Sequence, residues 1–257
     1  MADILQEIVA HKRCDLDRLL CKRVSMAEAL RQSPSGIIAE FKRKSPSKGW
    51  IHADVEPEQV IPRYVEGGAA ALSILTNEEY FGGKPEYITR VRGLVGSCPI
   101  LRKEFIIDPY QVYEARMLGA DAILLIAAAL DPHEYTQLLE LAHQLHLEVL
   151  LEVHDPAELE YLKAGVPDML GVNNRSLGTF HTDVQHSFDI AEAMLDAVSH
   201  LGTRRPVLVS ESGISNPEVI KRLRKVGFRG FLIGECFMRE PDPGQALTSF
   251  VQAIVNC

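Results

Sequence analysis

One unit recurs along almost the whole chain: a short apolar, β-branched run, then a loop, then a stretch with helical periodicity. Each run is short enough to be a buried strand. Strands that alternate with helices pair in parallel through right-handed crossovers. The runs are Gly36–Phe41, Ala70–Leu75, Pro99–Leu101, Ala122–Ile126, Glu148–Leu151, Met169–Val172, Val207–Val209 and Gly230–Ile233.

Several of the intervening helices have recognisable starts. Asp108-Pro109, Asp131-Pro132 and Asp155-Pro156 each place a side-chain acceptor at the N-cap and proline at the first helical position, with Gln or Glu two residues after the proline. Asn216-Pro217 is a related start. The cap oxygen accepts from otherwise unpaired amides, and proline has no amide to leave unpaired. Each start follows a predicted strand by a few residues.

Eight such units in 257 residues predict an α/β fold, a (β/α)8 or TIM barrel, with residues 1–257 forming one domain. The open doubly wound sheet is the alternative, but no GxGxxG motif follows the first run. Residues 1–35 precede that run. We expect them to form an N-terminal helical extension that covers one end of the barrel.

The charge balance limits the possible partners. The chain has 27 Lys and Arg against 35 Asp and Glu, a net charge of −8, so it has no general attraction for nucleic acid. No stretch approaches the roughly 18 apolar residues of a membrane span, and the N-terminus lacks the apolar run of a signal peptide. The five cysteines lack zinc-site spacing, which favours reduced thiols. We therefore expect a cytoplasmic protein with no metal.

Charged residues stand where four of the runs end. Side chains alternate along a strand, so each of these residues shares a face with the residue two positions earlier: Ile38, Glu40 and Lys42 lie on one face, and the others follow an apolar residue. In a barrel the carboxyl ends of the strands meet at one mouth, where active sites lie. The charged residues are Glu40, Lys42, Lys103, Glu152 and Glu211. Any one alone could be a solvated surface charge, but five together predict an active site with shifted proton affinities.

The turns after the seventh and eighth runs predict a phosphate site. Barrels commonly bind phosphate at these two turns through backbone amides. Gly213 and Gly234 would let the backbone approach an anion closely, although both could be ordinary turn glycines. The loop Lys42–Gly49 is basic and rich in hydroxyls, and it is either a lid over an anionic substrate or a solvated loop.

The sixth run leads into Asn173, Asn174 and Arg175. The guanidinium of Arg175 has the planar fork that suits a carboxylate, and Asn173 offers both a donor and an acceptor. The alternative for the Asn-Asn pair is a turn.

Seven blocks of the sequence, in order and spanning nearly the whole predicted barrel, resemble the indole-3-glycerol phosphate synthase family. The segment before the first strand is also similar to the N-terminal extension of that family. The blocks are IIAEFKRKSPSKG (Ile37–Gly49), ALSILTNEEYFGG (Ala71–Gly83), ILRKEFIIDPYQVYEARMLGADAILLI (Ile100–Ile126), LLEVH (Leu150–His154), GVNNRSL (Gly171–Leu177), SESGI (Ser210–Ile214) and FLIGE (Phe231–Glu235).

The resemblance implies a carboxy-lyase of tryptophan biosynthesis. Its substrate would be a phosphorylated small molecule, 1-(2-carboxyphenylamino)-1-deoxyribulose 5-phosphate. The products would be indole-3-glycerol phosphate, carbon dioxide and water. Members of the family need no metal or organic cofactor. Association with other enzymes of the tryptophan pathway stays open.

The resemblance also implies catalytic roles. Lys103 matches the general acid that protonates the ketone oxygen, and Glu152 matches a base for the later loss of a proton. Lys42 matches a lysine that contacts anionic groups of the substrate and takes part in dehydration. Glu40 matches a carboxylate that holds the lysines. Asn173 matches a residue that positions the anthranilate part of the substrate.

The remaining matches concern substrate binding. Arg175 matches a residue near the anthranilate part, and Phe105 an aromatic of the apolar pocket for the benzene ring. We also expect Glu211 to bind the substrate. One departure is Glu235, where some members have serine, so a hydroxyl contact to phosphate is lost. The matched phosphate contacts are Ser45, Ser212, Gly213 and Gly234.

Three other functions compete with this one. Phosphoribosylanthranilate isomerases share the barrel and phosphate site, but they place a catalytic cysteine at the first strand, where this chain has Glu40 and Lys42. A Schiff-base aldolase would use Lys103 as a nucleophile. A non-catalytic phosphate-binding barrel would be expected to lack the charged residues at the strand ends.

Overall fold

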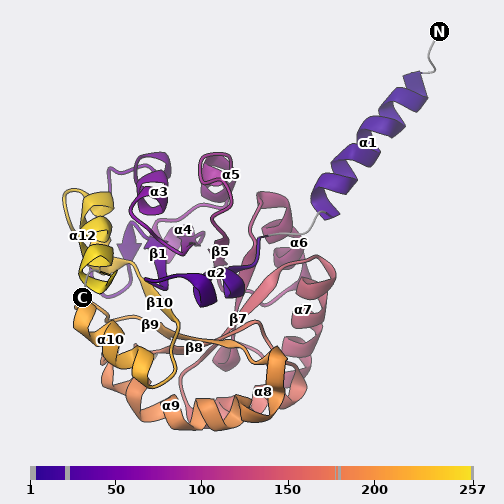
Figure 1. Ribbon diagram of the computed structural model, residues 1–257. Coiled ribbons are helices and arrows are strands. Elements are labelled where there is room, and N and C mark those ends of the chain that lie inside the picture. Colours follow the sequence, from indigo (N-terminus) through magenta and orange to yellow (C-terminus); the bar gives the residue numbers. More distant parts are fainter. Residues whose placement is uncertain (1–3, 21–23, 177, 179–180, 256–257) are drawn as a thin grey trace.

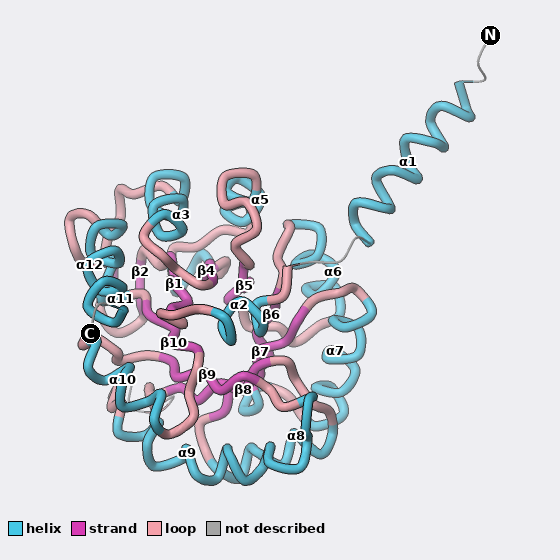
Figure 2. The backbone as a smooth tube through the Cα atoms, in the orientation of Figure 1, coloured by secondary structure: helices cyan, strands magenta, loops and turns pink. Residues whose placement is uncertain are grey.

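Eight parallel strands close into a barrel, with helices packed around it (Figures 1 and 2). The computed structural model describes residues 4–20, 24–176, 178 and 181–255. The barrel strands are β1 (Ile37–Phe41), β4 (Ala71–Leu75), β5 (Ile100–Lys103), β6 (Ala122–Ile126), β7 (Glu148–Val153), β8 (Met169–Asn173), β9 (Val207–Glu211) and β10 (Gly230–Ile233). Their order is β1-β10-β9-β8-β7-β6-β5-β4, and β4 pairs back to β1. The predicted TIM barrel is confirmed.

All eight predicted runs coincide with barrel strands to within two residues at either end. Four strands extend beyond the predicted apolar segments. They end at Lys103, Val153, Asn173 and Glu211. These residues stay in the ladder: Lys103 is the register partner of Leu75, and Asn173 that of Glu211. The charged groups are therefore carried on the rigid sheet rather than on the loops beyond it.

The alternation of side chains divides the core into two layers. Along β6, Ala122, Leu124 and Ile126 point into the barrel, where they pack with residues such as Ile38 of β1. Ile123 and Leu125 point outward against the helices. Parallel strands buried on both faces are therefore apolar almost throughout, as the sequence is here.

Helices form the outer layer. They are α3 (Pro57–Glu66), α5 (Glu86–Arg92), α6 (Pro109–Leu118), α7 (Pro132–Gln144), α8 (Tyr161–Ala164), α9 (Gln185–Val198), α10 (Pro217–Lys225) and α12 (Pro243–Val255). The predicted caps are present: Asp108, Asp131 and Asn216 each accept a backbone amide at the start of α6, α7 and α10. Asp155 also caps, but the turn it starts is a 3-10 helix, η2 (Pro156–Glu160), which leads into α8.

The residues before β1 form two helices with different surroundings. In α2 (Met26–Gln32), Met26, Ala27 and Leu30 are buried in the inner core at the amino-terminal end of the barrel. Glu148, the first residue of β7, accepts from the backbone N–H of Ala27 at 2.8 Å and so holds α2 there. The first helix, α1 (Ile4–Leu20), projects away from the barrel (Figure 1). None of the described helices is long and apolar enough to span a membrane.

Short elements complete the loops at the other end of the barrel. The loop after β1 contains a small antiparallel hairpin of β2 (Lys44–Ser45) and β3 (Gly49–Trp50), which the sequence analysis did not predict. Further short helices at this end are α4 (Glu78–Phe81), η1 (Ala127–Ala129) and α11 (Glu235–Met238). The 3-10 helix η3 (Ser199–Arg204) instead connects α9 to the start of β9, at the amino-terminal end of the barrel.

Candidate active site

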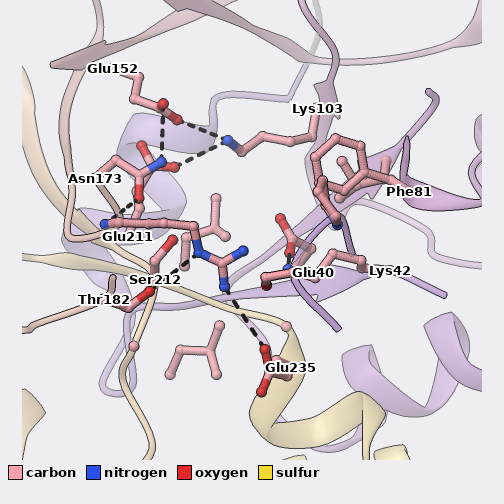
Figure 3. Close-up of a pocket in the computed structure, with 18 of the residues that line it drawn as sticks. Glu40, Lys42, Phe81, Lys103, Glu152, Asn173, Thr182, Glu211, Ser212 and Glu235 are labelled. Carbon is pink, nitrogen blue, oxygen red and sulfur yellow. Dashed lines mark hydrogen bonds and ion pairs between the residues drawn. The ribbon is translucent and has the colours of Figure 1, made fainter. Parts of the chain in front are cut away.

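A cavity of about 1030 Å³ opens at the carboxyl ends of the barrel strands. It is the position where barrel enzymes hold their active sites. The five charged residues predicted at strand ends all line it and point toward one another (Figure 3). They come from β1, β5, β7 and β9 or directly follow them: Glu40, Lys42, Lys103, Glu152 and Glu211.

Lys103 lies between two carboxylates. Its Nζ donates to Oε2 of Glu152 at 2.9 Å and lies 3.4 Å from Oε2 of Glu211. The second oxygen of Glu152 accepts from Nδ2 of Asn173 at 3.1 Å. Glu152 and Glu211 are almost fully buried. Two buried acids therefore share one lysine.

Burial and charge oppose each other in this group. Burial disfavours the charged form of Lys103, but Glu152, Glu211 and Glu40 outweigh it and raise the lysine pKa, so Lys103 carries a proton. Burial likewise opposes ionisation of Glu152. The charges of Lys103 and His154, with hydrogen bonds from Lys103 and Asn173, outweigh burial and lower the Glu152 pKa. The pair is ionic, with the proton on nitrogen.

Glu211 behaves differently although it faces the same lysine. Burial and the neighbouring charge of Glu152 outweigh the attraction of Lys103 and raise the Glu211 pKa to about 8. Its two oxygens are buried and accept no hydrogen bond from the described residues. Near neutral pH it is therefore mostly a neutral acid, whereas Glu152 is a carboxylate. Two carboxyl groups with pKa values pushed apart are typical of an acid–base site.

A second lysine–carboxylate pair comes from the end of β1. Lys42 Nζ donates to Oε1 of Glu40 at 2.6 Å, and the Glu40 side chain is 5% exposed. Gly234, directly after β10, packs against Glu40. A Cβ atom at this position would lie 2.6 Å from the Glu40 Oε1 and 3.0 Å from its Cβ. The glycine is required for this close approach.

The predicted phosphate turn after β9 has an unusual backbone. Ser212 has φ 68° and Gly213 φ 79°, and both residues line the cavity. Asn174 holds this turn: its Nδ2 donates to the carbonyl of Ser212 at 3.0 Å and to Oγ of Ser210 at 3.2 Å. Its Oδ1 accepts from the backbone N–H of Ser187 at 3.0 Å. The sequence analysis missed this role, because Asn-Asn after a strand also fits a turn.

The basic loop after β1 lies over one side of the cavity. Pro46, Ser47 and Lys48 line it. Ser45 does not: it is fully buried in β2, and its Oγ has no hydrogen-bond partner among the described residues. Within this loop the hydroxyl that lines the cavity is therefore that of Ser47, and the phosphate contact of Ser45 stays a prediction.

Two cations converge on Glu235, the residue at which some members of the resembled family have serine. Lys48 Nζ donates to Oε1 of Glu235 at 2.5 Å, and Arg175 Nη2 lies 3.9 Å from Oε2 of the same residue. Arg175 Nε also donates to Oγ1 of Thr182 at 3.3 Å. Glu235 thus takes part in the site through its side chain, and this mouth carries cations suited to a phosphate or carboxylate.

The apolar part of the cavity lies beside β5 and β6. Phe105 is 46% exposed and stacks on Phe81, with ring centroids 6.2 Å apart and an interplanar angle of 30°. Leu124 and Ile126 extend this surface inward. Phe81 was not predicted, although it stands in one of the matched blocks. Together these residues offer a flat apolar slot for an aromatic ring.

The arrangement supplies proton donors, a base and anion-binding groups from the chain itself. Among the described residues, no group of three or more His, Cys, Asp or Glu side chains is placed to hold a metal ion.

Comparison with known proteins agrees with this chemistry. Residues 4–250 match the family model described as indole-3-glycerol phosphate synthase. The enzyme of that name from Bacteroides thetaiotaomicron is 52% identical and covers 99% of this chain and 100% of the relative. Another from Azoarcus is 41% identical over 96% and 98%.

Structural comparison supports the fold. A tryptophan synthase alpha-subunit mutant from Pyrococcus furiosus superposes with a TM-score of 0.61 at 12% identity, covering 87% of this chain and 98% of that one. At this identity the likeness shows the barrel alone. The sequence relatives and the family model go further: the chain belongs to the indole-3-glycerol phosphate synthase family.

Proposed function

We propose that the cavity binds 1-(2-carboxyphenylamino)-1-deoxyribulose 5-phosphate and closes the indole ring, releasing carbon dioxide and water. The observation that carries this proposal is the group formed by Lys103, Glu152 and Asn173 at the bottom of a cavity with an apolar side and a cationic side. The substrate has a matching aromatic acid at one end and a phosphate at the other.

Lys103 acts first in this mechanism. When the aromatic carbon attacks the ketone, negative charge builds on the ketone oxygen. A protonated lysine both stabilises this charge and can donate the proton. The acidic groups around Lys103, Glu152 foremost, raise the Lys103 pKa and keep the lysine charged in the free protein. Loss of carbon dioxide then makes ring closure effectively irreversible.

Glu152 acts last, as the base that removes a proton to restore aromaticity. Its lowered pKa keeps it ionised near neutral pH, as a base must be. Asn173 donates to one of its oxygens and fixes the plane of the carboxylate. The other oxygen accepts from Lys103, so one hydrogen bond fixes the distance between the acid, Lys103, and the base, Glu152.

The second pair, Lys42 and Glu40, supports the dehydration step. Loss of the hydroxyl as water requires a proton donor, and Lys42 is the other lysine among the strand-end residues of the cavity. Glu40 holds its Nζ at 2.6 Å and limits its movement. This division of labour between two lysines is part of the proposal.

The ends of the substrate would orient it. Backbone amides at Ser212, Gly213 and Gly234 are proposed to bind the phosphate, and Arg175 to bind an anionic group beside it. Phe105, stacked on Phe81, would pack against the benzene ring. Glu211, mostly neutral, can donate a hydrogen bond to the substrate between these ends. Remote binding of this kind orients the reacting atoms.

The wider setting follows from the same chemistry. The partner of the site is a phosphorylated small molecule, and the reaction places the protein in tryptophan biosynthesis. We propose that it works in the cytoplasm as one unit over residues 1–257. Association with other enzymes of this pathway stays a prediction.

Indole fluorescence tests the proposal directly. Wild-type protein given the carboxyphenylamino substrate should produce fluorescent indole product, and Lys103→Ala should lower kcat by about 10²- to 10⁴-fold, the range for loss of a general acid. Lys163→Ala, an exposed lysine of α8, serves as the control. Absence of product from folded wild-type protein would contradict the proposal.

The Schiff-base alternative has its own test. Borohydride added with substrate would trap a covalent adduct on Lys103 if this lysine were a nucleophile. The ion pairs of Lys103 keep it protonated, and a protonated amine does not attack a carbonyl. We therefore expect no increase in protein mass.

A further inference from the structure

His154 lies behind the proposed base, outside the substrate cavity. It follows β7 and shares the side of the strand on which Glu152 lies, two residues earlier. Its Nε2 is 3.4 Å from Oε1 of Glu152. Glu152 lines the cavity and His154 does not, so the carboxylate stands between the substrate and the imidazole.

The imidazole is unusually poor in hydrogen bonds. The side chain is 13% exposed, both ring nitrogens are buried, and neither has a hydrogen-bond partner among the described residues. Buried polar groups in native proteins are nearly always paired, and an exception calls for an explanation. The ring nitrogens instead face two carboxylates: Nε2 faces Glu152, and Nδ1 lies 4.0 Å from Oε2 of Glu158.

The backbone around His154 is held firmly. Its N–H donates to Oε2 of Glu158 at 2.6 Å, and its carbonyl accepts from Nε2 of His186, on α9, at 2.9 Å. The ring therefore has a fixed anchor and free nitrogens. Glu158 belongs to η2, and its side chain is 20% exposed, more than that of His154 or of Glu152. Side-chain exposure therefore increases from Glu152 through His154 to Glu158, a series that leads from the cavity toward the surface.

The proposed chemistry gives this series a use. In each turnover Glu152 takes a proton from the ring carbon while the C–H electron pair returns to the aromatic system. That proton must leave before the next cycle. The Glu152 side chain is 3% exposed, and on the cavity side its oxygens are occupied by Lys103 and Asn173. A route to the surface on its far side would free the base without passing through the occupied cavity.

We propose that His154 is a positioning and proton-relay residue, which receives the proton from Glu152 and passes it through Glu158 to solvent. The inference rests on the proposed role of Glu152 as base. The relay starts from a neutral imidazole with its proton on Nδ1. In the first step the Glu152 O–H bond breaks and an Nε2–H bond forms, giving an imidazolium between two carboxylates. In the second step the Nδ1–H proton passes to the Glu158 carboxylate, after an approach of about 1 Å to hydrogen-bonding distance.

Charged groups around the relay fit this direction of transfer. Glu152 on β7 and Glu158 on η2 stabilise an imidazolium. His186 on α9 bonds to the backbone carbonyl of His154. Lys103 and Glu211 lie on the opposite, cavity side of Glu152. The relay uses the neutral ring; when His154 is itself protonated, its charge is one of the influences that lower the Glu152 pKa.

The test is the pH profile and solvent isotope effect of His154→Asn, which keeps polarity but cannot titrate. We expect kcat to fall about tenfold or more with KM within about twofold, because substrate contacts are untouched. The solvent deuterium effect on kcat should increase. The acid limb of kcat/KM should move to higher pH, since a charge that lowers the Glu152 pKa is gone. His133→Asn, whose exposed ring contacts Gln137 on α7, is the matched control.

Glu158→Gln is the second variant, because glutamine can still accept the His154 N–H and preserve the turn. It should lower kcat in the same way, and the double variant should be no slower than His154→Asn alone. Wild-type kcat, isotope effect and pH profile in His154→Asn would overturn the relay. Absence of indole product already in the wild type would overturn the proposed function, which is a different result.

Discussion

Lys48 and Glu235 meet across the mouth of the barrel, with Lys48 Nζ donating to Glu235 Oε1 at 2.5 Å. The pair joins the loop after β1 to the turn after β10. Burial opposes ionisation of Glu235, but Lys48, Lys42 and Arg175 outweigh it and lower the carboxyl pKa. Glu235 is therefore an anion at the proposed phosphate site, and it holds cations that a phosphate would otherwise use.

Glu235→Ser should strengthen phosphate binding. The carboxylate both repels a phosphate and occupies Lys48 and Arg175, so its removal should lower the inhibition constant of inorganic phosphate about two- to fivefold, the range for partly exposed ion pairs. Competitive inhibition of ring closure measures this. Glu218→Ser, which breaks the exposed Lys221–Glu218 pair of α10, should leave the constant unchanged. Weaker phosphate binding in Glu235→Ser would contradict the prediction.

Glu211→Gln should change how stability depends on pH. The folded-state pKa of Glu211, about 8, lies above the value of 4.5 expected in the unfolded chain. Its contribution to stability is therefore fully present below pH 4.5 and is lost as pH rises through 8. Glutamine mimics the neutral acid and does not titrate. Thermal melts from pH 5 to 9 should show the Tm of the variant rising relative to wild type by several degrees.

The control for this experiment is Glu218→Gln, which removes an exposed carboxylate of α10. Its stability relative to wild type should not rise with pH in this way. A constant Tm difference between Glu211→Gln and wild type across the range would mean that Glu211 is ionised throughout.

Asn174→Ala should both destabilise the fold and weaken substrate binding. The side chain is buried and bonds to Ser187, Ser210 and Ser212, so its loss leaves several buried polar groups unpaired. We expect a cost of about 2–4 kcal/mol in the free energy of unfolding. KM should rise because the Ser212 turn loses its anchor. Denaturant titration and steady-state kinetics measure the two effects.

Asn216→Ala is the matched control for this change. It removes a side-chain cap from α10, on the outside of the barrel, and should cost about 1 kcal/mol without changing KM. If Asn174→Ala cost no more than Asn216→Ala and left KM unchanged, the anchoring role of Asn174 would be wrong.

The barrel and the strand-end charges could be predicted because two periodic signals agree along the chain. Apolar runs of strand length mark the buried sheet, and Asp-Pro caps mark the helix starts between them. The predicted strands ended too early at Leu101 and Val209, because the next residue in each case is polar and was treated as the end of an apolar run. In the barrel, Lys103 and Glu211 keep their ladder bonds while their side chains reach the polar mouth.

Other features depend on tertiary contacts that no local pattern encodes. The β2–β3 hairpin has two residues in each strand and no hydrophobic alternation, so the basic loop gave no sign that Ser45 would be buried and Ser47 presented. Asn174 bonds to Ser187 and Ser210, far away in sequence. The carbonyl of His154 likewise accepts a bond from His186 on α9, 32 residues further along the chain.

Gly234→Ala should impair catalysis while leaving most of the fold in place. The new Cβ would lie 2.6 Å from Oε1 of Glu40, so this carboxylate would have to move away from Lys42, which it holds at 2.6 Å. Misplacing a catalytic group by about 1 Å can cost about a hundredfold in rate, and we expect kcat/KM to fall by about that factor. Gly93→Ala is the control, because a Cβ there meets nothing within 4 Å. Equal activity of the two variants would show that the close packing of Gly234 on Glu40 does not position the Glu40–Lys42 pair.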